Sequence, residues 1–173
     1  YLTENADHVI IQTPYVICNG YMYDVLQGIS DHAKLQIVLN AVEKGSNPWG
    51  CTDYLNQKKK ILETGADVYE LMNDYPVHTK AVLINDRLSV VGSYNLDMRS
   101  TYLDTELMLV IDSEKLSQLI HETESDYMEK SKEVLANGQE TEGAKYQGKV
   151  LNRKKKLYYG VLRIIIRPLR QLL

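Results

Sequence analysis

The stretch 77–106 carries the residues whose types and spacing could do chemistry. His78 and Lys80 are separated by one residue, and a Gly-Ser-x-Asn segment that contains Ser93 and Asn95 follows after eleven more. An imidazole, an ammonium, a hydroxyl and an amide can together bind a phosphate and supply a nucleophile or a proton donor. The sequence therefore predicts a catalytic phosphate site in this stretch.

A predicted β-hairpin brings the two halves of this motif together. The runs 77–84 and 88–91 are rich in apolar, β-branched residues and flank Asn85-Asp86-Arg87, which is typical of a hairpin turn. The second strand then runs antiparallel to the first, and its end at Gly92 lies beside the start of the first strand. Both halves of the motif are therefore expected at one end of the hairpin.

Within the first strand, the pleat is expected to place His78 and Lys80 on the same face. Glu106 begins the next predicted strand, 106–111, and is a candidate to hold one nitrogen of the His78 ring. A His-x-Lys pair alone says little, because His32 and Lys34 form a second one with no Gly-Ser-x-Asn behind it. The complete spacing, and not the pair alone, indicates a catalytic site. The alternative is that His78 and Lys80 face solvent from an edge strand.

Short β-rich runs alternate with helical patterns along the whole chain, which predicts an α/β or α+β sandwich. Besides the hairpin and 106–111, the expected strands are 8–12, 34–39 and 66–71. Helices are expected at about 20–31, from Thr52 or Asp53 to Gly65, and from an N-cap at Asp112 to about Asn137. This pattern predicts a catalytic lobe over 1–136, a polar linker over 137–150 and a basic tail over 151–173.

The charge is distributed unevenly between the body and the tail. All 23 acidic residues and 12 of the 20 basic residues lie in 1–148, so that part has a formal charge of −11, whereas 149–173 has eight basic residues and no acid. Phosphate neutralisation supplies most of the affinity for duplex nucleic acid, so we expect no duplex partner for the acidic body. The tail suits an anionic surface.

Cysteine and histidine usage predicts neither a disulfide framework nor a metal or other cofactor. Cys18 and Cys51 cannot form a four-thiolate zinc site, and the four histidines, His8, His32, His78 and His121, show no ligand spacing. No apolar run is long enough to span a membrane, and no signal peptide is evident. The chain lacks an initiator Met, so we expect it to be a piece of a longer protein.

The motif resembles that of the phospholipase D superfamily, His-x-Lys-x4-Asp-x6-Gly-Ser-x-Asn. The segment ending in Thr13-Pro14-Tyr15, the strand 35–40 and the run 95–100 followed by Thr105-Glu106 look like the bacterial cardiolipin synthase and phospholipase D-like branch. The resemblance covers about 5–135. It implies one lobe of an α-β-α-β-α sandwich, metal-independent phosphodiester chemistry and a phosphohistidine intermediate.

The resemblance also implies a role for each motif residue. His78 would be the nucleophile or the general acid, Lys80 and Asn95 would hold the non-bridging phosphate oxygens, Ser93 would support the phosphate, and Glu106 would orient His78.

Further residues are placed around this set. Gly92, Tyr15 and Trp49 are candidates for substrate binding, and Trp49 could either reach a lipid interface or anchor a turn. The family's Asp position is Asn85 here, with Asp86 immediately after it. Because that position lies in the hairpin turn, we expect the change to have a structural consequence.

Family active sites combine two His-Lys-Asn sets, whereas this chain has one. We therefore expect a second motif-bearing lobe, either a missing N-terminal half or the mate in a symmetric homodimer, and the half-enzyme is favoured. As half of a two-motif enzyme, His78 would serve as acid rather than nucleophile. The isolated chain is expected to be inactive.

The tail combines apolar and basic residues at helical spacing, with Pro168 expected to kink the helix. Docking on anionic phospholipids at the cytoplasmic face of the cell membrane is favoured, and packing on the missing half is the alternative. The apolar residues are Leu157, Tyr158, Val161, Leu162, Ile164, Ile165, Ile166, Leu169, Leu172 and Leu173.

The leading functional hypothesis is a peripheral phosphatidyltransferase similar to cardiolipin synthase. The enzymatic alternative is a phospholipase D-type hydrolase or a homodimeric phosphodiesterase or nuclease. The non-enzymatic alternative is an inactive lobe that binds phospholipid or completes a partner's site.

Overall fold

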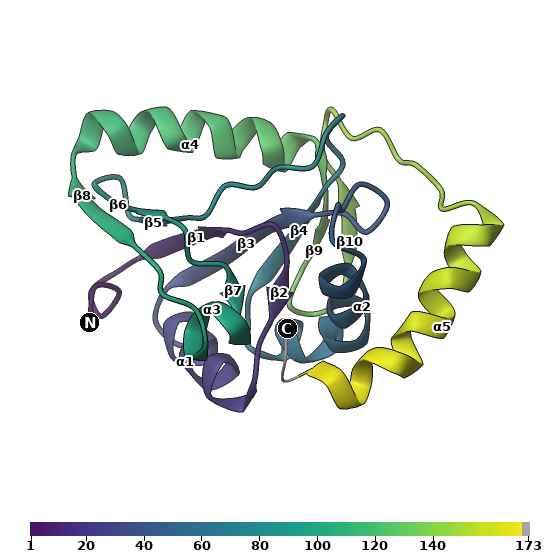
Figure 1. Ribbon diagram of the computed structural model, residues 1–173. Coiled ribbons are helices and arrows are strands. Elements are labelled where there is room, and N and C mark those ends of the chain that lie inside the picture. The colour runs from purple at the N-terminus through teal and green to yellow at the C-terminus, as the bar shows by residue number, and fades with distance from the viewer. Residues whose placement is uncertain (171–173) are drawn as a thin grey trace.

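The computed structural model describes residues 1–170 and shows a mixed β-sheet between two helical layers (Figure 1). One helix, α4 (Glu114–Glu129), covers one face, while α1 (Gly20–Ser30) and α2 (Pro48–Glu63) cover the other. Each face has its own apolar cluster, the larger one under α1 and α2 and a smaller one under α4. The expected α/β sandwich is confirmed.

The main sheet has eight strands in the order β10-β9-β4-β3-β1-β5-β6-β8. Its centre is parallel, because β1 pairs with β3 and β3 with β4, and the flanking strands are antiparallel. The strands are β1 His8–Gln12, β3 Lys34–Asn40, β4 Asp67–Leu71, β5 Ala81–Ile84, β6 Leu88–Gly92, β8 Met108–Asp112, β9 Ser131–Val134 and β10 Glu140–Glu142. A separate two-stranded sheet joins β2 (Val16–Ile17) to β7 (Leu96–Asp97), which leads into the short helix α3 (Met98–Tyr102).

Side-chain caps set where the long helices begin. Asn47 accepts hydrogen bonds from the backbone N–H groups of Trp49 and Gly50, so α2 begins at Pro48, earlier than the predicted start at Thr52 or Asp53. Ser113, and not Asp112, caps α4.

The prediction of one helix up to Asn137 is wrong. Helix α4 ends at Glu129, and the chain then adds β9 antiparallel to β4, with Lys132 Nζ 3.0 Å from a Glu70 carboxylate oxygen. The predicted linker contains β10, paired with β9. The open edge of β4 explains both differences, because unpaired strand groups gain hydrogen bonds from an added strand.

The tail forms α5 (Arg153–Leu169), which packs against α2 of the same lobe (Figure 1). Tyr159, Leu162 and Ile166 form its buried face. The predicted kink site, Pro168, lies in the last turn. The expectations for Leu172 and Leu173 lie outside the described residues. Across 1–170, no helix is long and apolar enough to cross a bilayer.

Candidate active site around His78 and Lys80

The β5–β6 hairpin joins the two halves of the motif, as predicted. Ala81 pairs with Val91, and the N–H of Gly92 donates to the carbonyl oxygen of Lys80 at 3.3 Å. The hairpin thus carries Ser93 to the end of the sheet where Lys80 enters it. The carboxyl ends of the parallel strands β1 and β3 meet at this same edge, which is where open α/β sheets generally bind ligands.

His78 and Lys80 do not lie in a strand, and this prediction is corrected. Strand β5 begins only at Ala81. Before it, Asn40 holds the chain, accepting from the N–H of Val77 and donating to its carbonyl oxygen, each at 2.8 Å. Because this side chain takes the place of a ladder partner, the segment leaves the sheet and can turn His78 and Lys80 toward each other.

The two motif side chains are in contact. Lys80 Nζ donates to the carbonyl oxygen of His78 at 2.9 Å and also lies against Nδ1 of its ring. Lys80 is buried, whereas the His78 ring remains accessible to solvent. Within the described residues Lys80 forms no ion pair with a carboxylate, so its ammonium is available to an anionic ligand.

The electrostatics of the pair favour a neutral imidazole. Partial burial lowers the pKa of His78 below its usual value, and the positive charge of Lys80 lowers it further. Burial also lowers the pKa of Lys80, against the opposing charges of Glu106 and Asp97. At neutral pH the uncharged ring can therefore act as a nucleophile or accept a proton.

Ser93 and Glu106 form a second unit at the end of β6. The Ser93 hydroxyl donates to a Glu106 carboxylate oxygen and accepts from the N–H of Leu107 at 3.0 Å. This contact with Ser93 is the main reason that the pKa of Glu106 lies below its usual value. Glu106 was expected to orient the His78 ring, but its hydrogen-bond partner is Ser93. It was also expected to begin a strand, but β8 begins two residues later, at Met108.

Gly92 is required by close backbone approach. A Cβ at this position would lie 2.0 Å from the carbonyl oxygen of Leu107. Strands β6 and β8 can therefore pair at this position only if the residue is glycine. The role of Gly92 visible in the structure is to place the neighbouring Ser93 against Leu107.

Asn95 is held by a residue that the sequence reasoning did not single out as functional. The backbone N–H and the side-chain amide of Asn95 both donate to Ser100 Oγ, at 3.2 and 3.4 Å. The buried amide oxygen, Oδ1, has no hydrogen-bond partner within the described part of the chain. Asp97 was also missed by the sequence reasoning. It is buried and caps α3 by accepting a hydrogen bond from the N–H of Ser100. The spacing Asp97-x-x-Ser100 before a short helical turn is the pattern that could have indicated this cap.

Tyr15 lies close to this loop, whereas Trp49 lies at the start of α2. Because Val16 pairs with Leu96, Tyr15 lies at the level of Asn95, and burial together with the charge of Asp97 raises the pKa of Tyr15. Its ring also packs on Gly50, where a Cβ would lie 2.7 Å from Tyr15 Cγ. Trp49 is 38% exposed at the start of α2.

The turn residues lie at the other end of the hairpin. Asn85 has a φ of 52°, and its Oδ1 accepts from the N–H groups of Asp7 and His8 at 2.9 and 3.2 Å. Asn85 therefore fixes the start of β1 to the turn, whereas the consequence of Asn in place of Asp at this position stays a prediction. Asp86 instead faces His8 and His121.

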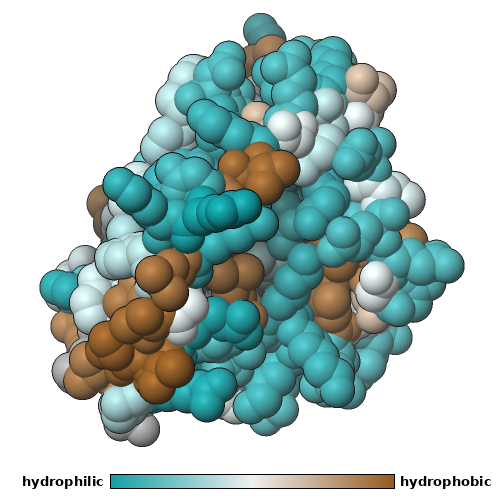
Figure 2. All heavy atoms as spheres, turned by 90° about the vertical axis from the view of Figure 1, so that its right-hand side faces the viewer, coloured by the Kyte–Doolittle hydropathy of each residue, from teal (hydrophilic) through white to brown (hydrophobic). Residues whose placement is uncertain are grey.

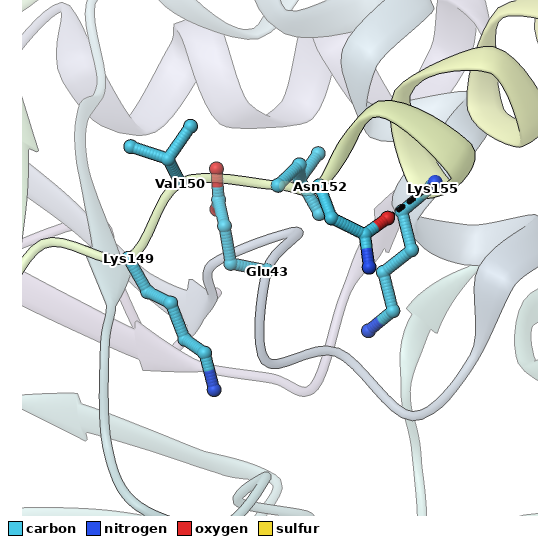
Figure 3. A pocket seen from close by; sticks show the side chains of 6 residues that line it. Glu43, Lys149, Val150, Asn152 and Lys155 are labelled. Atoms are coloured by element: carbon cyan, nitrogen blue, oxygen red, sulfur yellow. Dashed lines mark hydrogen bonds between the residues drawn. The ribbon is translucent and has the colours of Figure 1, made fainter.

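A hollow at the start of the tail is separate from the motif residues. Figure 3 shows Lys149 and Lys155 on either side of Glu43, with Asn152 capping α5 by accepting from the N–H of Lys155. None of the motif residues lines it. The catalytic candidates therefore lie at the end of the sheet where β5 begins and not in this hollow.

Known proteins resemble the chain in sequence. Cardiolipin synthase A of Proteus mirabilis (strain HI4320) is 30% identical over 150 residues, which cover 84% of this chain and 29% of the relative. Cardiolipin synthase A of Serratia proteamaculans (strain 568) is 28% identical over 152 residues, with 85% and 29% covered. The chain thus spans less than a third of the length of the curated relatives it matches.

Solved structures resemble it in fold. The phospholipase D family member Nuc from Salmonella typhimurium superposes with a TM-score of 0.62 at 15% identity, over 82% of this chain and 87% of that one. Phosphatidylserine synthase from Haemophilus influenzae Rd KW20 superposes with a TM-score of 0.67 at 16% sequence identity, over 99% of this chain and 43% of that one. The family described as cardiolipin synthase, PLD-like domain, matches residues 1–127. Motif, fold and family match agree, and the chain belongs to this phospholipase D-like family of cardiolipin synthases.

Proposed function

We propose that this chain is one catalytic lobe of a phosphatidyltransferase of the cardiolipin synthase type. The observation that carries the proposal is the contact between His78 and Lys80 at the end of the sheet where β5 begins. The ammonium of Lys80 forms no ion pair with a carboxylate in the described residues. A fixed positive charge beside an imidazole suits a phosphodiester, because negative charge builds on its non-bridging oxygens during transfer.

The proposed reaction proceeds in two displacements. The nucleophilic imidazole attacks phosphorus, a P–N bond forms, and the bond from phosphorus to the leaving alcohol oxygen breaks as a second histidine protonates that oxygen. A lipid hydroxyl then attacks phosphorus and gives its proton to the second histidine, and the P–N bond breaks. Lys80 and Asn95 would stabilise the phosphate oxygens, and the lowered pKa of His78 favours its neutral form for the attack or for taking the proton.

His78 would be one of these two histidines, and the other would come from another motif-bearing lobe. Beside Ser93 and Glu106, the edge strand β8 and the loop before it expose an apolar surface made of Leu103, Leu107, Leu109 and Val110, each more than half exposed. Strand β8 is also unpaired on its outer side within the described residues. Since exposed apolar edges are normally covered, we infer that the second lobe docks here, next to the motif.

The outer face of α5 would bind the membrane surface. Leu157, Val161, Ile164 and Ile165 point away from the lobe, and Figure 2 shows the resulting apolar patch bordered by hydrophilic residues. Residues 153–170 contain seven basic side chains and no acidic one. An apolar stripe with basic flanks is typical of helices that lie in the interface of anionic bilayers.

The test measures phosphatidyl transfer in phosphatidylglycerol vesicles, with mass spectrometry of the lipid products. This chain is assayed alone and together with a second motif-bearing lobe. Cardiolipin is expected only with both lobes, and His78→Ala is expected to lower its formation by roughly 10²- to 10⁴-fold. The matched control is His32→Ala in the other His-x-Lys pair, which should leave the rate unchanged.

Each product pattern has a defined meaning. Phosphatidic acid without cardiolipin would identify a hydrolase and overturn the transferase proposal. Unaltered lipids with both lobes present would overturn lipid chemistry altogether. Full activity of the His78→Ala variant would remove the assigned role of the His78–Lys80 pair.

A further inference from the structure

Two histidines that are far apart in the sequence meet at the end of the sheet opposite the motif. His8 begins β1, His121 lies in the middle of α4, and Asp86 lies in the β5–β6 turn. The rings of His8 and His121 have centroids 5.7 Å apart, and one carboxylate oxygen of Asp86 lies 3.6 Å from His8 Nε2 and 3.9 Å from His121 Nε2. One ligand atom from each residue falls within 4.8 Å of the other two.

We propose that His8, Asp86 and His121 form a binding site for a divalent transition metal ion, with zinc the best match. Two imidazoles and one carboxylate are a common zinc donor set, with water in the fourth position. Around a tetrahedral ion with bonds of about 2.0 Å, ligand atoms lie about 3.3 Å apart. The two nitrogen-to-oxygen distances, 3.6 and 3.9 Å, lie within about 0.6 Å of that value, and all three ligand atoms lie within 4.8 Å of one another, so side-chain rotations without backbone movement can close the site.

The backbone around the three residues is fixed before any ion binds. Asn85 Oδ1 accepts from the N–H of His8, and the carbonyl oxygen of Asn85 lies 2.9 Å from His121 Nε2. The N–H of Ser113 donates to the carbonyl oxygen of Arg87, which ties the start of α4 to the same turn. To bind a metal through Nε2, His121 must give up its contact with the Asn85 carbonyl oxygen.

The charges around the site favour a cation. The Asp86 carboxylate is 90% exposed and forms no ion pair with a lysine or arginine in residues 1–170, because the adjacent Arg87 pairs with Asp112. His8 and His121 are partly buried, with 32% and 22% of their side chains exposed.

The site is distinct from the proposed catalytic centre. Strand β5 separates Lys80 from the turn, and its four extended residues span about 13 Å. An ion here would join β1, the hairpin turn and α4. Because it binds the folded chain and not the unfolded one, it would raise the unfolding temperature as its concentration rises.

The experiment titrates the tag-free chain with Co²⁺, followed by visible absorption, and then displaces Co²⁺ with Zn²⁺. One Co²⁺ per chain with a tetrahedral spectrum is expected. His8→Gln, His121→Gln and Asp86→Asn should each weaken binding by at least about tenfold, as losing even a supporting group of a metal site does. His32→Gln, which changes a histidine outside the cluster, should bind like the unaltered chain.

Thermal unfolding in chelator and in zinc gives the second readout. Zinc should raise the unfolding temperature of the unaltered chain and of His32→Gln, but not of Asp86→Asn, whose exposed side chain can change without disturbing the fold. Absence of stoichiometric binding would overturn the proposal. So would unchanged affinity in His8→Gln and His121→Gln, or loss of binding only in His78→Gln, which would place the ion at the motif.

Discussion

Asn40, at the end of β3, holds the backbone of Val77 through two hydrogen bonds, one accepted and one donated. Asn40 is buried and also donates to the carbonyl oxygen of Pro14. This one amide therefore connects a central strand to the segment that carries His78. It determines where the segment of His78 and Lys80 leaves the sheet.

Replacing this amide should damage stability and the proposed activity together. Asn40→Ala leaves the N–H and the carbonyl oxygen of Val77 without their partner, which should cost about 1–3 kcal/mol. Urea unfolding measures the loss. Asn40→Asp keeps an acceptor for the Val77 N–H but sets a carboxylate oxygen against the carbonyl oxygens of Val77 and Pro14, so it should lose at least as much activity as Asn40→Ala; full activity in either variant would contradict this role.

The acid limb of the pH–rate profile should report the His78 imidazole. Because the pKa of His78 is lowered, the neutral form persists to a pH below the ordinary histidine range, and a rate that needs this form should fall only there. Lys80→Met removes the positive charge and should move the limb to higher pH while lowering the rate. The profile is measured as kcat/KM with both lobes present, and a limb that does not move would exclude the Lys80 charge as a cause.

Two glycine substitutions should have opposite signs. Gly92→Ala places a methyl group against the Leu107 carbonyl oxygen, so β6 and β8 must separate, at a cost of about 1–3 kcal/mol. Gly28→Ala, in α1, meets nothing within 4 Å and should stabilise the chain by about 0.5–1 kcal/mol. Thermal unfolding of both variants checks the pair, and equal effects would show that packing at Leu107 is not the determinant.

Glu124 should make the folded chain less stable as pH rises. It is 1% exposed, neither carboxylate oxygen has a hydrogen-bond partner in the described chain, and burial raises its pKa to about 8. The folded pKa lies above the unfolded one, so the folded chain holds more protons between the two. Stability from this group is therefore present at low pH and falls between about pH 4.5 and 8, by up to roughly 1.4 kcal/mol per pH unit.

Glu124→Gln removes this ionisation while keeping the shape of the side chain. The variant should be more stable than the unaltered chain at pH 8 and close to it at pH 5, as measured by urea unfolding at both values. A difference between the two proteins that does not depend on pH would show that Glu124 ionises freely in the fold.

Membrane binding should depend on the outer face of α5. Ile164→Glu puts a charge into the exposed apolar stripe and should abolish sedimentation with anionic vesicles without unfolding the chain, because Ile164 is 70% exposed. The matched control is Leu119→Glu, an exposed leucine on α4 at the opposite face of the sheet. Equal loss in both variants would contradict docking through α5.

The hairpin that joins the two halves of the motif was predictable from sequence. The spacing of His78, Lys80, Ser93 and Asn95 is local, and the turn at Asn85 fixes how the two strands meet. The alternation of β-rich runs with helical patterns likewise predicted the fold class, and the continuous apolar runs of the central strands agree with their burial on both faces.

Contacts between distant segments were decided only in the tertiary structure. Asn40 binds the backbone of Val77 in place of a neighbouring strand. Ser93 donates a hydrogen bond to the Glu106 carboxylate, which was expected to contact His78. Helix α4 ends early because the chain after it pairs with the open edge of β4 as β9. The meeting of His8 with His121 has the same origin, because residues 113 positions apart carry no spacing signal. Local pattern determines which elements form, whereas unsatisfied polar groups and open edges find their partners only once those elements are packed.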